Sequence, residues 1–475
     1  MNNYLQNDSA QAAVLLEQIK VQSLAYLENL SNRPTTADVQ VETTDQLNSE
    51  GVGTANALQQ FNDRFEKVMV ASSGPRYWGF VTGGTTPAAI AGDWLATVYD
   101  QNTQTANGQG DISAIIEKET IQLLLNLLNL PADFLGGFVT GATMSNFTCL
   151  GVARQWVGKV LNKDFAKEGV SPADIKIFSA TPHSSSIKAL SMLGIGSSNY
   201  IRVKTVEGNR EALDIDDLQN KIHELNGKPF ILISSAGTVN TVDFDDFNAI
   251  AQLKNKYNFF WHIDAAFGAF AACSPKYKHL VDGWQHADSI TIDCHKWLNV
   301  PYENGCWLIK EKHKLLQVET FQNSNAPYLG DPLEHFSYLN FLPENSRRLK
   351  ALPVWFSLIA YGKNGYKDIV ENCIGMAKQF GNFIQQQKAL ELLAPVRLNT
   401  VCFTLNEQEE QSRVQTLLEN INASGRIFMT ATVYKGRIAI RAAFVNWRTS
   451  ISDIDIAIEV VEEELQKMYS QLNLY

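Results

Sequence analysis

Short apolar runs alternate with helical patterns through the middle of this chain, and this alternation limits the possible folds more than any other feature. Several of the runs are apolar at successive positions, which is typical of strands covered on both faces. The pattern predicts an α/β fold whose sheet is largely parallel, with helices on both sides. The candidate strands are 175–179, 200–205, 230–234, 259–263, 289–292 and 306–309.

The two ends of the chain show other patterns. One apolar face recurs at helical spacing from Leu16 to Leu30, with caps offered by residues 7–9, and the following residues to about 75 are polar. After about residue 351 we expect a long helix to 387, strands at 401–405, 428–433 and 437–441, and helices at 413–423 and from 453. The predicted organisation is an N-terminal helical arm over 1–75 that packs on a partner subunit, a large domain over 76–350, and a small α+β domain over 351–475.

Charge and cysteine content argue against several classes of function. The chain carries 40 Lys and Arg against 50 Asp and Glu, and it has no basic run that would bind nucleic acid. No signal peptide is visible, and no apolar run approaches the roughly 20 residues of a membrane span. Neither a CxxC pair nor an HExxH motif occurs among the six cysteines and eight histidines, so no disulfide framework or metal site is expected. We expect a cytoplasmic protein with reduced thiols.

Chemically active side chains follow four of the expected strands. They are His183, Thr238, Asp264 and Lys296. Ligands of open α/β sheets bind beyond the carboxyl ends of the strands, so these side chains should meet at one edge. The segment 140–146, Thr-Gly-Ala-Thr-Met-Ser-Asn, opens a predicted helix, and the free N–H groups of such a helix start suit a phosphate.

A phosphate cradle, a carboxylate, an imidazole and a lysine at one edge describe a pocket for pyridoxal 5'-phosphate (PLP). The amine of Lys296 can form a Schiff base with the cofactor aldehyde. Asp264, facing the pyridine nitrogen, would keep it protonated and make the ring an electron sink. The imidazole of His183 can stack on the ring. A single lysine of this kind is usually a solvated surface group, and a single aspartate at a strand end is usually a helix cap. The interpretation as a PLP pocket therefore depends on finding all of these groups together.

Several motifs follow one another along the chain, at 75–80, Pro87, Asp93, 182–185, 262–266, 287–290, 293–297, 346–348 and Trp355. In this order and spacing they resemble the group II PLP-dependent amino acid decarboxylases, which include aromatic amino acid, histidine, tyrosine and glutamate decarboxylases. The resemblance spans most of the chain and implies a fold-type I PLP transferase-like architecture: a mostly parallel, mixed seven-stranded sheet, a small C-terminal α+β domain and an N-terminal helical arm. It also implies a homodimer with its active sites at the subunit interface.

The resemblance also implies roles for single residues. Lys296 would carry the cofactor, Asp264 would pair with the pyridine nitrogen, and His183 would stack on the ring. The other implied cofactor contacts are Ala266 beneath the ring, Ala142, Thr143 and His295 at the phosphate, and Thr238 beside the ring hydroxyl.

The family's mobile loop carries a tyrosine that reaches the neighbouring subunit's site. Counting back nine positions from Arg347 gives Tyr338 as the candidate proton donor, while Tyr328 is the other tyrosine of this loop. The chain departs from the family pattern at Met144-Ser145 and at Asp293-Cys294. Because an acidic Asp293 beside a phosphate would be repulsive, we expect it to face elsewhere.

The expected reaction is α-decarboxylation of an L-amino acid to its amine and carbon dioxide. Trp78, Phe80 and Val81 are expected to line the side-chain pocket, which favours an aromatic substrate slightly over an acidic one. Arg441 either meets a substrate carboxylate or is structural.

Other reactions of the same cofactor are the nearest alternatives: transamination, carbon–carbon lyase chemistry, or oxidative conversion to an aldehyde. In the family, phenylalanine at the loop tyrosine or asparagine at the stacking histidine points to aldehyde formation, so Tyr338 and His183 favour the amine. An alternative of another class is a non-catalytic scaffold, against which Lys296 and Asp264 argue.

Overall fold

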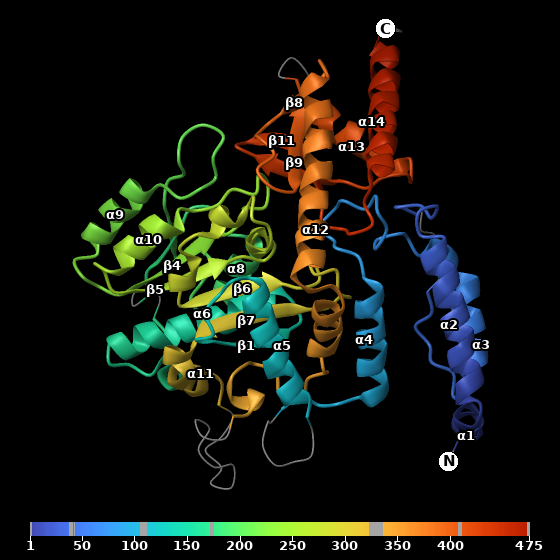
Figure 1. Cartoon of the computed structure of the whole chain (residues 1–475), viewed down its shortest axis with the longest axis horizontal. Coiled ribbons are helices and arrows are strands. Elements are labelled where there is room, and N and C mark those ends of the chain that lie inside the picture. The colour runs from blue at the N-terminus through green and yellow to red at the C-terminus, as the bar shows by residue number, and fades with distance from the viewer. Residues whose placement is uncertain are drawn as a thin grey trace.

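A seven-stranded sheet forms the centre of the molecule (Figure 1), with the strand order β1-β7-β6-β5-β4-β2-β3. The computed structural model describes residues 2–37, 41, 43–104, 112–171, 175–322, 336–406 and 411–472. Strands β2 to β6 run parallel to one another, whereas β7 is antiparallel to both β6 and β1. The predicted mixed, mostly parallel sheet is therefore confirmed. The strands are β1 (Phe134–Val139), β2 (Ile177–Ser179), β3 (Tyr200–Arg202), β4 (Phe230–Ser235), β5 (Phe259–Asp264), β6 (Ser289–Asp293) and β7 (Gly305–Lys310).

Alternate residues of each central strand enter different hydrophobic clusters. In β4, Ile231 and Ile233 pack on one side with α6 and α8, whereas Phe230 and Leu232 pack on the other side with α9 and α10. This alternation follows from the two-residue period of a strand and explains why the runs are apolar at successive positions. The helices around the sheet are α4 (Pro87–Tyr99), α5 (Ser113–Leu127), α6 (Ala142–Val160), α7 (Phe165–Glu168), α8 (Ser184–Met192), α9 (Ile215–Glu224), α10 (Phe247–Lys254) and α11 (Lys314–Phe321).

Strand β1 was not among the predicted strands, because two glycines interrupt its apolar pattern. A Cβ at Gly136 would lie 2.8 Å from the Leu308 side chain, and one at Gly137 would lie 2.9 Å from the Trp307 ring. Neighbouring side chains therefore fill the space that a larger residue would need. Glycine weakens a strand intrinsically, and here close packing decides the identity of the residue.

A second, antiparallel sheet lies at the C-terminal end, in the order β10-β11-β9-β8. A long helix, α12, joins the two parts, since it packs against α4 and α5 as well as β8, β9 and α14. It deviates from helical geometry at Gly362, whose φ is 57°. The elements here are α12 (Ala351–Gln386), β8 (Leu390–Leu392), β9 (Thr400–Leu405), α13 (Gln411–Ala423), β10 (Thr430–Tyr434), β11 (Arg437–Ala443) and α14 (Ile451–Leu472).

Three N-terminal helices lie away from the sheet (Figure 1): α1 (Asn3–Ala10), α2 (Ala12–Glu28) and α3 (Thr54–Arg64). None of them contains a buried residue. Residues 7–9 were expected to cap the helix that follows; instead they lie inside α1, which Asn2 caps.

Short 3-10 helices complete the described chain. They are η1 (Glu66–Val68), η2 (Gly268–Cys273), η3 (Lys278–Val281), η4 (Trp284–His286), η5 (Glu311–His313) and η7 (Tyr338–Asn340). In the part of the chain that the structure describes, no helix has both the length and the apolar character needed to cross a bilayer.

Candidate active site

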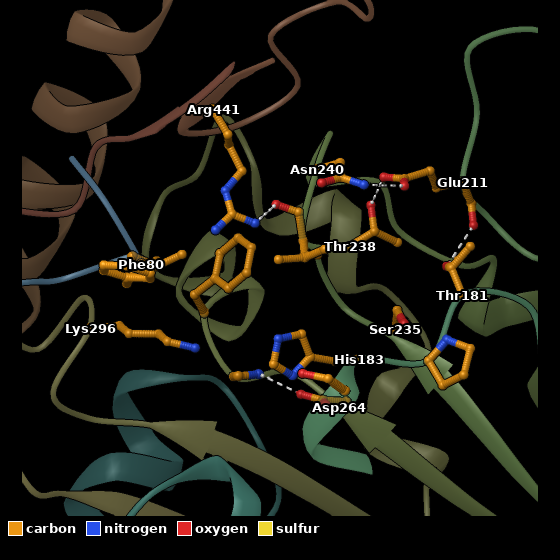
Figure 2. A pocket seen from close by; sticks show the side chains of 17 residues that line it. Phe80, Thr181, His183, Glu211, Ser235, Thr238, Asn240, Asp264, Lys296 and Arg441 are labelled. Atoms are coloured by element: carbon orange, nitrogen blue, oxygen red, sulfur yellow. Dashed lines mark hydrogen bonds between the residues drawn. The ribbon is translucent and has the colours of Figure 1, made fainter. Parts of the chain in front are cut away.

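A cavity of about 630 Å³ opens at the carboxyl ends of β2, β4, β5 and β6 (Figure 2). Arg441 of β11 enters it from the small sheet, so both parts of the chain contribute to one site. The lining residues are Phe80, Val81, Thr181, Pro182, His183, Ser184, Glu211, Ser235, Gly237, Thr238, Val239, Asn240, Asp264, Ala266, Phe267, Lys296 and Arg441. The four side chains that were expected to meet at the strand ends, those of His183, Thr238, Asp264 and Lys296, therefore line the same cavity.

Asp264, the last residue of β5, is buried and is held by neutral donors. Its Oδ2 accepts hydrogen bonds from the Asn146 amide at 3.0 Å and the Ser186 hydroxyl at 3.1 Å, and its Oδ1 accepts one from the Ala266 N–H at 3.3 Å. Burial alone would raise the pKa of Asp264, but His183, His262 and the Asn146 hydrogen bond lower it below its ordinary value. Asp264 is therefore a carboxylate at neutral pH and can receive a cation from the cavity.

His183 caps α8 and lines the cavity next to Asp264 (Figure 2). Its Nδ1 accepts a hydrogen bond from the Ser185 N–H at 3.2 Å and lies 2.7 Å from the Ser185 hydroxyl. Burial lowers the pKa of His183, and this effect outweighs the opposing influence of Asp264. The ring is therefore neutral at neutral pH, and its flat face is available for stacking.

Lys296 forms an ion pair with Asp293, with 2.9 Å between Nζ and Oδ2. Backbone packs tightly behind it, because a Cβ on Gly83 would lie 1.9 Å from the Lys296 carbonyl oxygen. The expectation that Asp293 faces away from the phosphate site is wrong. Its Oδ1 accepts a hydrogen bond from the Ala142 N–H at 2.6 Å, because this N–H opens α6 and has no helical partner.

The predicted phosphate contacts converge on the same place. Gly141, the N-cap of α6, supplies no side-chain cap, so the first N–H groups of that helix depend on other acceptors. Ala142 and Thr143 are the first residues of α6, and His295 lies close by, its Nε2 3.6 Å from Asp293. The Nδ1 of His295 accepts the Asn304 N–H at 3.3 Å, which leaves Nε2 to carry the proton. This donor set suits a phosphate, although Asp293 competes for it.

Glu211 was missed by the sequence analysis and lies above the cavity (Figure 2). Its Oε2 accepts hydrogen bonds from the hydroxyls of Thr238 and Thr241 at 2.6 and 2.7 Å. Asn240 of the same turn reaches the small sheet, where it accepts a hydrogen bond from Thr432 at 2.6 Å. Glu211 therefore holds the turn that carries Thr238. Because it lies in a loop 27 residues before Thr238, no local pattern could have revealed it.

Arg441 is a buried cation that forms no ion pair with any described residue. Its Nη1 donates to the Val239 carbonyl at 3.0 Å, and its Nε has no hydrogen-bond partner within the described ranges. Burial lowers the pKa of Arg441, but a guanidinium stays charged in proteins. A guanidinium that has no ion-pair partner among the described residues and lines a cavity wall suits an incoming carboxylate.

Phe80 and Val81 line the cavity, but Trp78 does not, and its expected place in the substrate pocket is wrong. Trp78 is fully buried between Phe380 and Phe444, and its indole N–H donates to the Pro75 carbonyl at 2.8 Å. The backbone changes direction after it. Phe80 and Val81 have φ values of 54° and 61°, a conformation that non-glycine residues rarely adopt and that Val81 tolerates poorly.

Tyr338 lies within the chain's own core, and its assignment as the proton donor is wrong. A side chain that reaches into a neighbouring subunit is exposed in a single chain, whereas Tyr338 is 1% exposed. Its hydroxyl donates to the Gly136 carbonyl at 3.2 Å, and the Arg347 guanidinium lies 4.5 Å from its ring centre. Tyr328, the other tyrosine of this loop, lies outside the described residues.

Comparison with known proteins decides the family. The model of the pyridoxal-dependent decarboxylase conserved domain matches residues 54–406. The chain belongs to this family. Its resemblance to the group II decarboxylases is thereby confirmed, and its cofactor is PLP.

Three known proteins illustrate the likeness. The aromatic-L-amino-acid decarboxylase of Bacillus atrophaeus is 31% identical over 83% of this chain and 82% of that protein. The phenylacetaldehyde synthase of Petunia hybrida is 28% identical over 83% and 81%. The crystal structure of Oryza sativa TDC with PLP and tryptamine matches with a TM-score of 0.88 at 20% identity, over 97% of this chain and 98% of that one. This last likeness confirms the fold-type I architecture.

Membership of the decarboxylase family indicates that the cavity binds PLP. The residues present fit PLP: a lysine for the aldehyde, a carboxylate that keeps its charge for the ring nitrogen, and a helix start for the phosphate. The roles of the single residues remain predictions. The exceptions are Trp78 and Tyr338, which the geometry removes from the site.

Proposed function

We propose that this protein removes the α-carboxylate of an L-amino acid as carbon dioxide and releases the corresponding amine. One observation carries the proposal. Lys296, Asp264 and His183 line a single cavity, and Arg441 adds a cation to its wall. The family contributes the class of reaction, and these four side chains contribute the means to perform it.

Bound PLP supplies an aldehyde carbon that takes up the substrate amine and a ring that accepts electrons. The task of Asp264 is to hold a proton at the ring nitrogen. Lys296 would hold the cofactor through its amine and would release the product. Arg441 holds the substrate carboxylate with its guanidinium group, and His183 covers one face of the ring. Phe80 and Phe267 restrict the access of water to the reacting atoms.

An aromatic side chain suits the cavity better than an acidic one. Phe80, Val81, Val239 and Phe267 give the lining an apolar part. The carboxylate of Glu211 lies at the same cavity and would repel a second carboxylate on the substrate. The B. atrophaeus relative is named for aromatic substrates, which adds support.

Aldehyde formation is the second candidate function, because a relative of comparable identity is an aldehyde synthase. The sequence argument for the amine used Tyr338 and His183. Since Tyr338 is not part of the cavity, that argument now depends on His183 alone. The amine stays the expected product, and the organic product must be identified directly.

The decisive experiment is a carbon dioxide release assay on PLP-loaded protein with a panel of L-amino acids. The product of each reaction is identified by mass spectrometry. We expect release with a matching amine from tryptophan, tyrosine, phenylalanine or dihydroxyphenylalanine, and none from Lys296→Ala. A keto acid or an aldehyde would favour the other PLP reactions. Absence of release from every amino acid would contradict the proposal and leave a non-catalytic role.

We also propose a homodimer in which the arm, helices α1 to α3, packs on the partner subunit. Helix α2 exposes Val14, Leu16, Ile19 and Leu24, each by 39% or more, although it contributes no buried residue to its own chain. An apolar helix face of this kind is usually covered. Light scattering should give twice the 52.9 kDa chain mass, and deletion of the arm should give monomers.

The arm over 1–75, the large domain over 76–350 and the small domain over 351–475 are proposed as the functional division of the chain. We further propose that the protein acts in the cytoplasm. All six cysteines are free thiols, and five of them are buried, as in proteins of a reducing compartment. Fractionation of the cells that express it would test this.

A further inference from the structure

A buried chain of hydrogen bonds connects Asp264 to His183 through the side chains of Asn146 and Ser185, neither of which lines the cavity. The amide nitrogen of Asn146, on α6, lies 3.0 Å from Asp264 Oδ2 and 3.1 Å from Ser185 Oγ. Ser185 Oγ in turn lies 2.7 Å from His183 Nδ1. Asn146 and Ser185 are 0% and 7% exposed, so water does not offer these groups other partners.

The direction of each bond follows from the chemistry of its ends. The carboxylate of Asp264 only accepts hydrogen bonds, so the Asn146 atom that faces it must be the NH₂ group. The Oδ1 of Asn146 then faces His262 Nε2 at 2.8 Å, and His262 must donate there. Burial lowers the pKa of His262 to about 4, so this ring is neutral and has one N–H to give. Its other nitrogen, Nδ1, accepts from the Ser289 hydroxyl at 2.8 Å.

The same reasoning continues to the cavity. Ser185 Oγ accepts the second N–H of Asn146, so its own hydroxyl proton is free to be donated to His183 Nδ1. The backbone N–H of Ser185 also donates to that nitrogen, at 3.2 Å. Two donors converge on Nδ1, which therefore cannot carry a proton in the neutral ring.

We propose that Asn146, acting through Ser185, is a positioning residue that fixes His183 as the neutral tautomer with its proton on Nε2. His183 then offers the cavity a hydrogen-bond donor and no free lone pair. Such a ring can hold an anionic oxygen of a ligand, but its Nε2 cannot take up a proton from a reacting carbon. The inference concerns the histidine itself and holds whichever reaction of PLP the protein performs.

Several charges act on His183 and must be considered together. Asp264 and Asp293 favour the doubly protonated ring, whereas Lys296, Arg441 and burial oppose it. Burial is the largest of these influences, which leaves the pKa of His183 below its ordinary value. The tautomer is therefore the relevant state near neutral pH.

The test is nitrogen NMR of the full-length protein labelled with [¹⁵N]histidine, with and without PLP. Eight histidines give few signals, and His183→Gln identifies the pair that belongs to His183. We expect a protonated Nε2 and an unprotonated Nδ1. A proton on Nδ1, or an equal mixture of tautomers, would overturn the proposal.

Variants test the role of Asn146. In Asn146→Asp, the new carboxyl group would share a proton with Asp264 and accept the hydroxyl proton of Ser185, so the Ser185 oxygen would accept from His183. We expect a signal for protonated Nδ1, and an unchanged tautomer would contradict the role of Asn146. Should that variant not fold, Ser185→Ala removes the hydroxyl alone, and we expect a measurable fraction protonated on Nδ1.

Ser186→Ala is the matched control. It removes a hydrogen bond of 3.1 Å to Asp264 Oδ2. Ser186 is buried and adjacent to Ser185 in sequence, but its hydroxyl forms no hydrogen bond with His183 in the described structure. We expect the tautomer of His183 to stay unchanged in this variant. An equal change in Ser186→Ala and Ser185→Ala would show that Asp264, and not the path through Asn146, governs the histidine.

Discussion

Two aspartates end neighbouring strands of the same sheet, Asp264 on β5 and Asp293 on β6, yet their surroundings differ. Asp264 is bound by three neutral donors and forms no ion pair with a described residue. Asp293 is already paired with Lys296 at 2.9 Å and with the start of α6. The two are 7% and 3% exposed, so burial does not distinguish them. The difference teaches that the partners of a buried carboxylate, rather than its depth, decide whether it can receive a cationic ligand.

Removing the charge of Asp264 should have the largest effect. In Asp264→Asn the amide cannot hold a proton at the cofactor's ring nitrogen, so we expect carbon dioxide release to fall about 10³-fold. Single-turnover assays on PLP-loaded protein measure this, with cofactor content and circular dichroism as controls. A rate within tenfold of the wild type would remove Asp264 from the mechanism.

Removing the charge of Asp293 should change the affinity for the cofactor. We expect an improvement, whereas the loss of the Asp264 charge impairs the reaction. In Asp293→Asn the amide oxygen would still accept the Ala142 N–H, while a negative charge beside the phosphate is lost. We expect this variant to bind PLP about tenfold more tightly, or about 1.4 kcal/mol. A fluorescence titration gives the dissociation constant.

Pyridoxine 5'-phosphate is the matched ligand for this experiment, because it has the phosphate but no aldehyde to react with Lys296. Equal tightening for both ligands would assign the effect to the phosphate. Weaker binding of both would mean that Asp293 supports the phosphate instead of repelling it.

Tyr338 belongs to the core of the chain and does not line the cavity. Tyr338→Phe loses the bond to the Gly136 carbonyl, which should cost about 1 kcal/mol of the free energy of unfolding. Urea denaturation measures this loss. The yield of amine should not change, and an altered product would return Tyr338 to the reaction.

The smallest effect should be on the free energy of unfolding at acid pH, measured for Asp264→Asn. Because the pKa of Asp264 is lowered in the folded state, the unfolded chain binds more protons near pH 4, and stability falls as the pH falls. Asp264→Asn removes one titrating group, so its unfolding free energy should decline less steeply between about pH 5 and pH 3. A slope equal to that of the wild type would contradict the lowered pKa.

The central strands and the chemistry at their ends could be predicted because both depend on local patterns. A buried strand needs successive apolar residues, and its carboxyl end is where a parallel sheet places ligands. Lys296, Asp264, His183 and Thr238 were found in this way. Strand β1 was missed, since its glycines are explained only by the side chains of Leu308 and Trp307 against them.

Side-chain direction was the part that sequence patterns misjudged. Trp78 and Tyr338 are aromatic residues near the site in sequence, but one turns into the core beside Phe444 and the other bonds to Gly136. Asp293 was expected to turn away and instead faces the start of α6. Each outcome depends on contacts with residues more than 100 positions away.

The sequence by itself determined the class of fold and the cofactor, and it predicted the residues that would carry the cofactor, because period, strand ends and motif order are properties of short segments. Only the tertiary structure decided the partners of each charge. It brought Glu211 to Thr238 and Arg441 to Val239, and it connected Asn146 to both Asp264 and His183. Electrostatic and hydrogen-bonding partners depend on distances of a few ångströms across the fold, and these distances are set by packing and not by sequence separation.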